Sequence, residues 1–159
     1  MTSPAASTTT RGSQASWPAA ATARESRSEV VAAPSTAYLY PGQGIQSEGM
    51  GAGDRAASPA AREIWRRADT HTREALGFSI LALGRDNPTE VTVRGEVHRH
   101  PDGVLYLTQF TQVALATLAL AQTARLREAD ALVADAFYAG HSLGEYTALS
   151  AYAGTIDLE

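Results

Sequence analysis

The stretch Ala136-Phe137-Tyr138-Ala139-Gly140-His141-Ser142-Leu143-Gly144-Glu145-Tyr146 decides the fold class. Residues 136–139 are apolar or aromatic and predict a short strand, whereas the run from 143 to 152 predicts a helix that Gly154 would stop. Between them lies Gly-x-Ser-x-Gly, which is typical of a sharp strand-to-helix turn that exposes a nucleophilic serine. The two glycines are needed because Cβ atoms two residues either side of the strained serine would collide. The sequence therefore predicts Ser142 as a nucleophile.

Two backbone N–H groups are candidates for stabilising an oxyanion beside Ser142. Leu143 opens the predicted helix, where its N–H and the positive end of the helix dipole favour negative charge. A second donor normally comes from a loop after a neighbouring strand. Residues 36–40 predict such a strand, and Pro41-Gly42-Gln43-Gly44 follows it, so the N–H of Gln43 is the second candidate.

Two other interpretations of these glycine-rich turns remain open. The 41–44 loop resembles a phosphate-binding loop only weakly, because no Gly-Lys-Ser/Thr follows it and the chain contains no lysine. Ser142 would be a simple helix cap if the second turn were purely structural.

A serine nucleophile needs a general base, and the histidines of this chain are poor candidates. His141 adjoins Ser142, so its side chain is expected to point away from the nucleophile and to face substrate or serve the structure. His71, His98 and His100 fall on a helix or in a polar segment, where solvated side chains are expected. In turns of this kind the base follows the serine, and no histidine follows Ser142.

Two further helices are predicted upstream of the turn. The first starts with Ser58 as N-cap and Pro59 at the first helical position. Its apolar stripe is predicted to comprise Ala61, Ile64, Trp65, Ala68, Ala75 and Leu76, and its solvated face to carry Arg62, Arg66, Arg67 and Arg73. The second helix is predicted over 111–127. It is apolar nearly all round from 113 to 121, so we expect it to be buried.

The alternation of strands and helices predicts an α/β fold with a parallel sheet. Residues 1–35 are low in complexity and predict a disordered, linker-like tail, and residues 84–103 predict a polar surface excursion. Residues 36–159 are then the folded part, for which the 44% hydrophobic content supplies a core.

Composition excludes several function classes. The net charge of −4 argues against partners recognised by bulk negative charge, namely nucleic acid and anionic membrane. No apolar run approaches the ~20 residues that span a bilayer. The absence of cysteine excludes a disulfide framework, a thiol nucleophile and a Cys-ligated metal site. We therefore predict a cytoplasmic protein without a metal site.

Three blocks of the sequence, in the same order, resemble malonyl-CoA:acyl-carrier-protein transacylases. They are Tyr40-Pro41-Gly42-Gln43-Gly44 with its continuation to Gly51, Thr111-Gln112-Val113-Ala114-Leu115, and Ala139 to Leu149 around Ser142. Val113 departs from the proline usual in the second block. The longer stretch 103–112 is similar to the malonyl/palmitoyl transferase domain of the type I fatty acid synthases of actinobacteria and fungi.

The resemblance implies an α/β-hydrolase-like parallel-sheet core and a ping-pong reaction. Ser142 would accept a malonyl group from malonyl-CoA and pass it to the phosphopantetheine thiol of an acyl carrier protein. The oxyanion of the tetrahedral intermediate would lie between the backbone N–H groups of Gln43 and Leu143. Gln112 matches a glutamine that lines the active site of the family, and His141 is assigned to substrate binding. The implied partners are the acyl carrier protein and other fatty acid synthase domains, with no bound cofactor.

The resemblance also implies parts that this sequence does not show. The family's histidine base, the arginine that clamps the malonyl carboxylate and a ferredoxin-like subdomain would all follow residue 159. The chain is therefore expected to be the first part of the domain and inactive alone. A serine hydrolase such as a thioesterase, and a non-catalytic remnant or assembly module, remain the alternatives.

Overall fold

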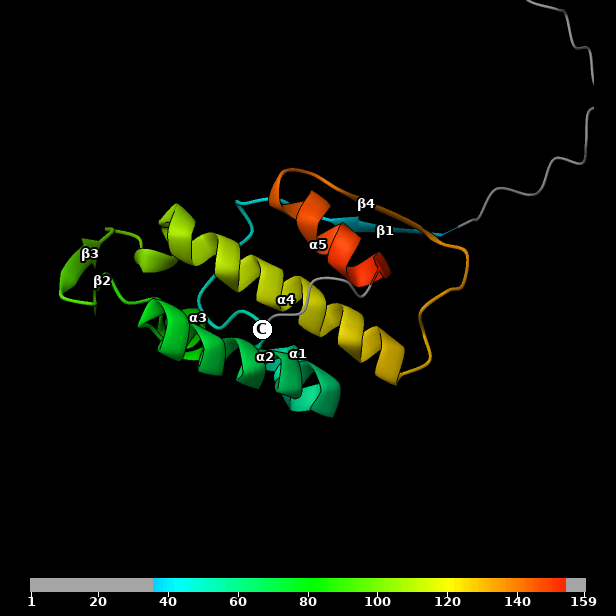
Figure 1. Ribbon diagram of the computed structural model, residues 1–159, viewed down its shortest axis with the longest axis horizontal. Helices are drawn as coiled ribbons and strands as arrows, with labels where there is room; N and C mark the ends of the chain where they lie inside the picture. The colour runs from blue at the N-terminus through cyan, green and yellow to red at the C-terminus, as the bar shows by residue number, and fades with distance from the viewer. Residues whose placement is uncertain (1–35, 154–159) are drawn as a thin grey trace, which may run out of the picture. The chain divides into compact units, whose positions relative to one another are not determined.

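The computed structural model describes residues 36–153, which belong to one compact unit of the chain. The predicted tail at 1–35 and the predicted helix stop at Gly154 lie outside the described residues. Within that range a two-stranded parallel sheet packs against helices, and a separate antiparallel hairpin projects from one end (Figure 1).

The parallel sheet joins two strands that are far apart in the sequence. Strand β1 (Ala37–Tyr40) pairs with β4 (Phe137–Gly140), and Tyr40 lies opposite Gly140. The predicted parallel α/β arrangement is confirmed, with each strand within one residue of its predicted place. Because parallel strands end at the same edge of a sheet, the loop after β1 and the turn after β4 emerge side by side.

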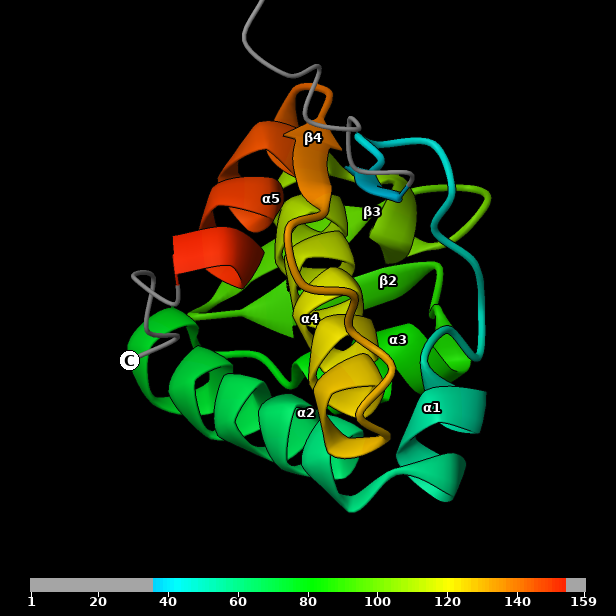
Figure 2. The same ribbon diagram turned by 90° about the vertical axis from the view of Figure 1, so that its right-hand side faces the viewer.

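The helices fill the chain between and after these strands. In order they are α1 (Ala52–Ala57), α2 (Pro59–His71), the π-helix η1 (Thr72–Leu76), α3 (Ile80–Asp86), the 3-10 turn η2 (Val104–Tyr106), α4 (Thr108–Glu128) and α5 (Leu143–Ala153). Helix α4 contacts α2 on one side and α5 on the other, and α5 contacts both strands. Figure 2 shows the resulting layers from the end: the sheet, then α4 with α5, then α2.

Helix α2 starts where the sequence predicts. Ser58 caps it, because its side chain accepts a hydrogen bond from the Ala61 N–H at 3.0 Å, and Pro59 holds the first helical position. Glu128 at the end of α4 also bonds to this terminus, since its carboxylate accepts from the Ala60 N–H at 3.2 Å and from the Ser58 hydroxyl. The start of α2 is thereby tied to the end of α4.

The predicted apolar stripe of α2 is correct for its first part and wrong for its end. Ala61, Trp65 and Ala68 are buried, whereas Ala75 and Leu76 are exposed. The chain leaves α-helical geometry at Thr72 and forms a π-helix, in which the Gly77 N–H bonds to the Thr72 carbonyl. A π turn contains an extra residue, so the residues after it are rotated away from the face they would occupy in an α-helix.

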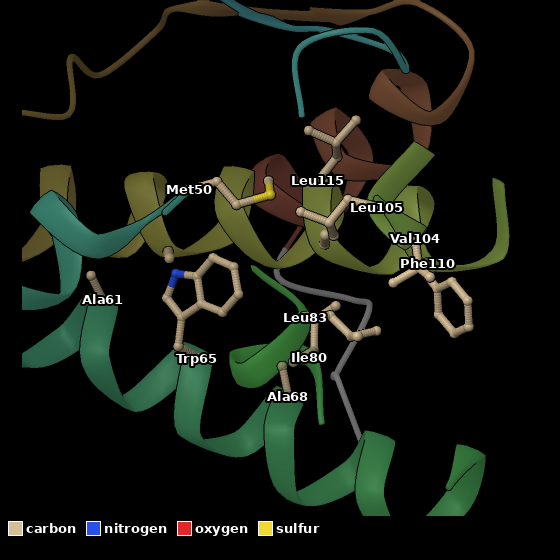
Figure 3. Close-up of a cluster of buried hydrophobic side chains, with 12 residues drawn as sticks. Met50, Ala61, Trp65, Ala68, Ile80, Leu83, Val104, Leu105, Phe110 and Leu115 are labelled. Atoms are coloured by element: carbon tan, nitrogen blue, oxygen red, sulfur yellow. The ribbon is translucent and has the colours of Figure 1, made fainter. Parts of the chain in front are cut away.

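Helix α4 is the central element of the core. It begins at Thr108, almost one turn before the predicted start at 111, and buried residues recur along its length: Phe110, Thr111, Ala114, Leu115, Thr117, Ala121 and Thr123. Burial on more than one side follows from its position between α2 and α5, as its sequence predicts. Figure 3 shows the main core, where Trp65, Ile80, Leu83 and Leu105 gather between α2, α3 and α4.

The predicted excursion at 84–103 is more regular than expected. It contains the antiparallel hairpin of β2 (Glu90–Val93) and β3 (Glu96–Arg99), turned at Arg94 and Gly95, both with positive φ. The strands were predicted as a polar loop because they contain exposed charged residues such as Glu90 and Glu96. Gly84 and Gly103, expected at the surface, are buried.

Asp69 joins α2 to α3 through a cluster of hydrogen bonds. Its carboxylate accepts from Arg73 Nε at 2.6 Å, from Ser79 Oγ at 2.5 Å and from the Leu81 N–H at 3.1 Å. Burial is the largest influence and raises the pKa of Asp69, but the hydrogen bonds from Ser79, Arg73 and Leu81 together outweigh it. The pKa of Asp69 therefore lies below its ordinary value of 3.8.

Replacing Asp69 by asparagine is expected to lower the free energy of unfolding by ~1–3 kcal/mol at neutral pH, because charged hydrogen bonds are lost. Since the folded-state pKa is depressed, this contribution is complete above about pH 5 and is lost as the pH falls through the folded-state pKa. Urea unfolding from pH 7 to pH 3 checks this. The two proteins should converge in stability at acid pH, and a difference independent of pH would contradict the ionised role of Asp69.

Candidate active site

Ser142 lies in a sharp turn between β4 and α5 in a strained backbone conformation. Its φ is 55°, in the left-handed region that residues other than glycine rarely adopt. A Cβ atom on Gly140 would lie 2.0 Å from the Gly144 carbonyl, and one on Gly144 would lie 1.9 Å from the Tyr40 carbonyl oxygen. Both glycines are thus required sterically, which gives the turn the geometry expected of a nucleophile elbow.

The hydrogen bonds of the turn leave one N–H group available beside the serine. The Gly144 N–H donates to the His141 carbonyl at 2.9 Å, and the Glu145 N–H donates to the Ser142 carbonyl at 3.0 Å. Among residues 36–153, the Leu143 N–H has no hydrogen-bond acceptor. It also opens α5, where the helix dipole is positive, so it suits the predicted role in an oxyanion hole.

The loop after β1 packs directly against this turn. A Cβ atom on Gly42 would lie 3.5 Å from Ser142 Cβ, 3.3 Å from His141 Nδ1 and 3.0 Å from the His141 carbonyl oxygen. The next residue, Gln43, is exposed, and its N–H has no acceptor in the described part of the chain. The structure therefore brings the loop of Gln43 to Ser142, and the role of Gln43 as second oxyanion donor stays a prediction.

The described residues provide no proton acceptor for Ser142. Its hydroxyl is exposed and forms no hydrogen bond with any residue from 36 to 153. His98 packs edge-on against Phe110 and His100 stacks on Tyr106, both on the hairpin side of the core. His141, predicted to bind substrate, is exposed beside Gly42 rather than bonded to Ser142.

Gln112 and Leu143 line one pocket, although 31 positions separate them in the sequence. The pocket has a volume of 270 Å³ and lies among the end of α2, the first half of α4 and the start of α5. His71 also lines it, which the sequence did not indicate, because nothing in a helical pattern shows which distant residues share a cavity. A larger cavity of 490 Å³ along β4 and α5 touches none of Ser142, Leu143 and Gln43.

Replacing Ser142 by glycine is expected to stabilise the fold while removing the predicted nucleophile. The left-handed conformation costs a residue with a Cβ ~1–2 kcal/mol, and the greater freedom of glycine when unfolded offsets about half of that gain. We expect a net gain of ~0.5–1 kcal/mol in the free energy of unfolding. Thermal and urea unfolding check this, with Ser142→Ala as the matched control, since alanine keeps the strain. Equal stability of the two variants would argue against backbone strain at position 142.

Residues 37–159 match the family model described as "Acyl transferase domain". The chain belongs to the acyl transferase domain family. Its strand-to-helix turn at Ser142, the adjoining glycine loop and the parallel strands that carry them therefore belong to an acyl transferase domain.

Individual relatives agree with this assignment. The chain is 34% identical over 148 residues to the fatty acid synthase beta subunit stcK of Emericella nidulans, covering 73% of this chain and 8% of that one. The malonyl CoA-acyl carrier protein transacylase of Clostridium perfringens superposes with a TM-score of 0.58 at 29% identity, covering 77% of this chain and 33% of the other.

A second similar structure contains a complex. It is a type II PKS acyl-carrier protein in complex with its malonyl-transacylase, with a TM-score of 0.58, 31% identity, and coverage of 77% of this chain and 34% of that chain. The present chain thus spans about a third of the length of the transacylases and less than a tenth of the synthase subunit. In the described part of the chain, no helix has the length and apolar character needed to cross a membrane.

Proposed function

We propose that this acyl transferase domain transfers a malonyl group from CoA to an acyl carrier protein in fatty acid biosynthesis, through an ester on Ser142. The observation that carries the proposal is the elbow itself. Ser142 is held at φ 55° between two sterically required glycines, with an unengaged N–H group at the start of α5. The malonyl transacylases and the fatty acid synthase subunit that resemble the chain support the choice of substrate.

In the first half-reaction the Ser142 oxygen attacks the thioester carbonyl of malonyl-CoA. The carbonyl electrons move to its oxygen, where the N–H groups of Leu143 and Gln43 would stabilise the negative charge. The C–S bond then breaks, CoA leaves as the thiol after accepting the serine proton, and malonyl-serine remains. In the second half-reaction the phosphopantetheine thiol attacks this ester, the C–O bond breaks, and the proton of the thiol returns to Ser142.

Two further site residues have supporting but smaller roles in this proposal. Gln112 lines the pocket beside Leu143 and is exposed, so its amide is available to the bound acyl group. His141 lies against Gly42 at the mouth of the elbow and is assigned to substrate contact. The reaction requires no bound cofactor, because the CoA thioester supplies the activated acyl group.

The proposed partners are an acyl carrier protein and the other domains of a fatty acid synthase, and the proposed location is the cytoplasm. The similar transacylase bound to an acyl-carrier protein supports the acyl carrier protein as partner. The similarity to a synthase beta subunit supports the other synthase domains as partners.

Incubating the chain with malonyl-CoA is expected to place a malonyl ester on Ser142, detected by intact mass and peptide mapping. Because no described residue accepts the Ser142 proton, acylation should be slow and turnover absent, since loss of a triad base costs several orders of magnitude in rate. Added imidazole should supply an external base and accelerate labelling.

The control for labelling is Ser142→Ala, which should remain unlabelled with and without imidazole. Label that persists in Ser142→Ala, or label that appears on another residue, would contradict the assignment of Ser142 as the nucleophile. Rapid hydrolysis of the ester in water, with no transfer to a phosphopantetheine thiol, would instead favour a thioesterase.

A further inference from the structure

Tyr40 ends strand β1 and contacts the elbow through its backbone. Its carbonyl oxygen accepts a hydrogen bond from the His141 N–H at 3.2 Å, and the residue lies opposite Gly140 in the sheet. The same oxygen is the atom that a Cβ on Gly144 would approach to 1.9 Å. The loop that carries Gln43 begins at the next residue, so the position of Tyr40 affects both sides of the proposed oxyanion site.

The side chain of Tyr40 is buried in a second, smaller core cluster. It is 8% exposed and shares this cluster with Ala148 and Ala151 of α5. Its hydroxyl lies 3.0 Å from the Oγ1 atom of Thr123 on α4, a residue 83 positions away in the sequence. Tyr40 therefore contacts the elbow with its backbone and the central helix with its hydroxyl.

The direction of this hydrogen bond follows from the number of protons available. The Thr123 hydroxyl has one proton and donates it to the Ala119 carbonyl at 2.9 Å. The Tyr40 hydroxyl is then the donor and Thr123 Oγ1 the acceptor. Burial is the largest influence on Tyr40 and raises the pKa of its hydroxyl above the ordinary value of 10.0, so the hydroxyl remains a donor at neutral and mildly alkaline pH.

Helix α4 is also fixed to α5. Arg127 lies one turn after Thr123 on α4, and its guanidinium donates to the Ala151 carbonyl. That carbonyl belongs to the last turn of α5, where helical carbonyls have no partner within the helix. Because α5 begins at Leu143 and β1 leads into the loop of Gln43, α4 is a common support for the two proposed oxyanion donors.

Phenylalanine at position 40 would preserve most of the packing. The ring of Tyr40 stacks on that of Tyr138 with the centroids 6.4 Å apart, and this contact does not need the hydroxyl. Without the phenol, Thr123 would still have its hydrogen bond to Ala119. The fold therefore depends mainly on the ring. The hydroxyl fixes where the end of β1 lies along α4, because a hydrogen bond tolerates little change in distance and angle.

We propose that Tyr40 is a positioning residue for acyl transfer at Ser142, through its hydrogen bond to Thr123. The bond holds the end of β1 at a fixed place on α4, and with it the separation of the N–H groups of Gln43 and Leu143. A developing oxyanion requires both donors at hydrogen-bonding distance from one point. The inference rests on the proposed transferase function and adds a residue that acts through the backbone of its own strand.

The test is single-turnover malonyl labelling of Ser142 in the 159-residue chain, at one imidazole concentration and over a range of malonyl-CoA concentrations. Tyr40→Phe should lower the maximal labelling rate by about tenfold, since a displaced donor stabilises the oxyanion less. The malonyl-CoA concentration that gives half the maximal rate should change by less than about twofold, because ground-state binding is unaltered. A change confined to that concentration, or an unchanged maximal rate in folded Tyr40→Phe, overturns the proposal.

Tyr38→Phe is the matched control on the same strand. The Tyr38 hydroxyl accepts from the Val133 N–H at 2.9 Å and donates to the Ala131 carbonyl at 3.4 Å, both in the segment between α4 and β4. This variant should be labelled at the wild-type rate. Equal slowing of Tyr38→Phe and Tyr40→Phe would show that loss of any β1 hydroxyl has the same effect, which also overturns the proposal.

A double-mutant cycle tests whether Tyr40 acts through Thr123. Thr123→Val removes the acceptor and should slow labelling, whereas Thr123→Ser retains it and should label at nearly the wild-type rate. The double variant Tyr40→Phe/Thr123→Val should be no slower than Tyr40→Phe, because both substitutions remove the same bond. Losses that multiply in the double variant overturn the proposal. If Tyr40→Phe fails to fold by circular dichroism, the two Thr123 variants decide the question, and equal rates in them overturn it.

The wild-type chain separates this proposal from the function on which it rests. Absence of any ester on Ser142 refutes the transferase function, and the role of Tyr40 with it. An ester on Ser142 with unchanged rates in Tyr40→Phe and Thr123→Val leaves the function standing and removes the role assigned to Tyr40.

Discussion

Replacing Gly144 by alanine is expected to unfold the nucleophile elbow and to abolish acylation of Ser142. The added Cβ would lie 1.9 Å from the Tyr40 carbonyl oxygen and 3.0 Å from that of Pro41, both backbone atoms. Neither can move without displacing β1, which pairs with β4 up to Gly140. Overpacking against fixed backbone costs ~3 kcal/mol or more, so we expect a loss of at least that size in the free energy of unfolding.

Gly53→Ala is the matched control for this substitution. Gly53 lies in helix α1, and a Cβ there would meet no atom within 4 Å. Alanine at that site should stabilise the protein by ~0.5–1 kcal/mol, because it reduces the freedom of the unfolded chain. Urea unfolding and malonyl labelling of both variants measure the contrast. Wild-type labelling in Gly144→Ala would show that the close approach of β1 and α5 is unnecessary for the nucleophile.

Replacing Trp65 by alanine is expected to lower the free energy of unfolding by ~3–5 kcal/mol. Trp65 is fully buried on α2 in the main core, and Arg55 lies over its ring with the guanidinium carbon 4.8 Å from the ring centroid. A Cβ atom on Gly51 would approach Trp65 ring atoms to 2.5 Å, and one on Gly84 would lie 3.7 Å from them. The indole therefore holds the glycine-rich loop after β1 against α2 and α3.

Trp65→Phe separates packing from hydrogen bonding at this site. The indole Nε1 is buried and, among the described residues, has no hydrogen-bond partner. Phenylalanine removes that unpaired donor, whose burial is unfavourable, so part of the lost packing is offset. We expect this variant to lose less than ~1.5 kcal/mol in urea unfolding. A loss equal to that of Trp65→Ala would indicate that the N–H has an acceptor such as buried water.

The elbow was predictable because its pattern is local. Gly140, Ser142 and Gly144 lie within five residues, and the collision between a Cβ on Gly140 and the Gly144 backbone is a consequence of the turn alone. The collision that requires glycine at 144 is with Tyr40 of β1, which only the tertiary structure shows. The two strands beside the turn were also predicted from local sequence, as were the N-cap at Ser58 and the burial of α4. The same local blocks were sufficient to indicate the acyl transferase family, which the match over residues 37–159 confirms.

The errors of the sequence analysis have a common cause. Helical periodicity predicted that the apolar stripe of α2 continues to Leu76. In the structure the α-helix ends with a π-turn at Thr72, next to the hydrogen bonds of Asp69 and the turn at Gly77. The hairpin at 90–99 was missed because its strands carry charged residues on exposed faces. In both regions, contacts between elements override or obscure the local pattern.

The sequence by itself determined the class of fold and the family and predicted Ser142 as the nucleophile, because each depends on residues that are neighbours in the chain. The tertiary structure alone decided which distant residues surround Ser142. Gly42 meets His141 and Ser142 because β1 and β4 are parallel and end together. Gln112 shares a pocket with Leu143 because α4 packs against both α2 and α5. Such approaches follow from strand pairing and helix packing, which no short stretch of sequence encodes.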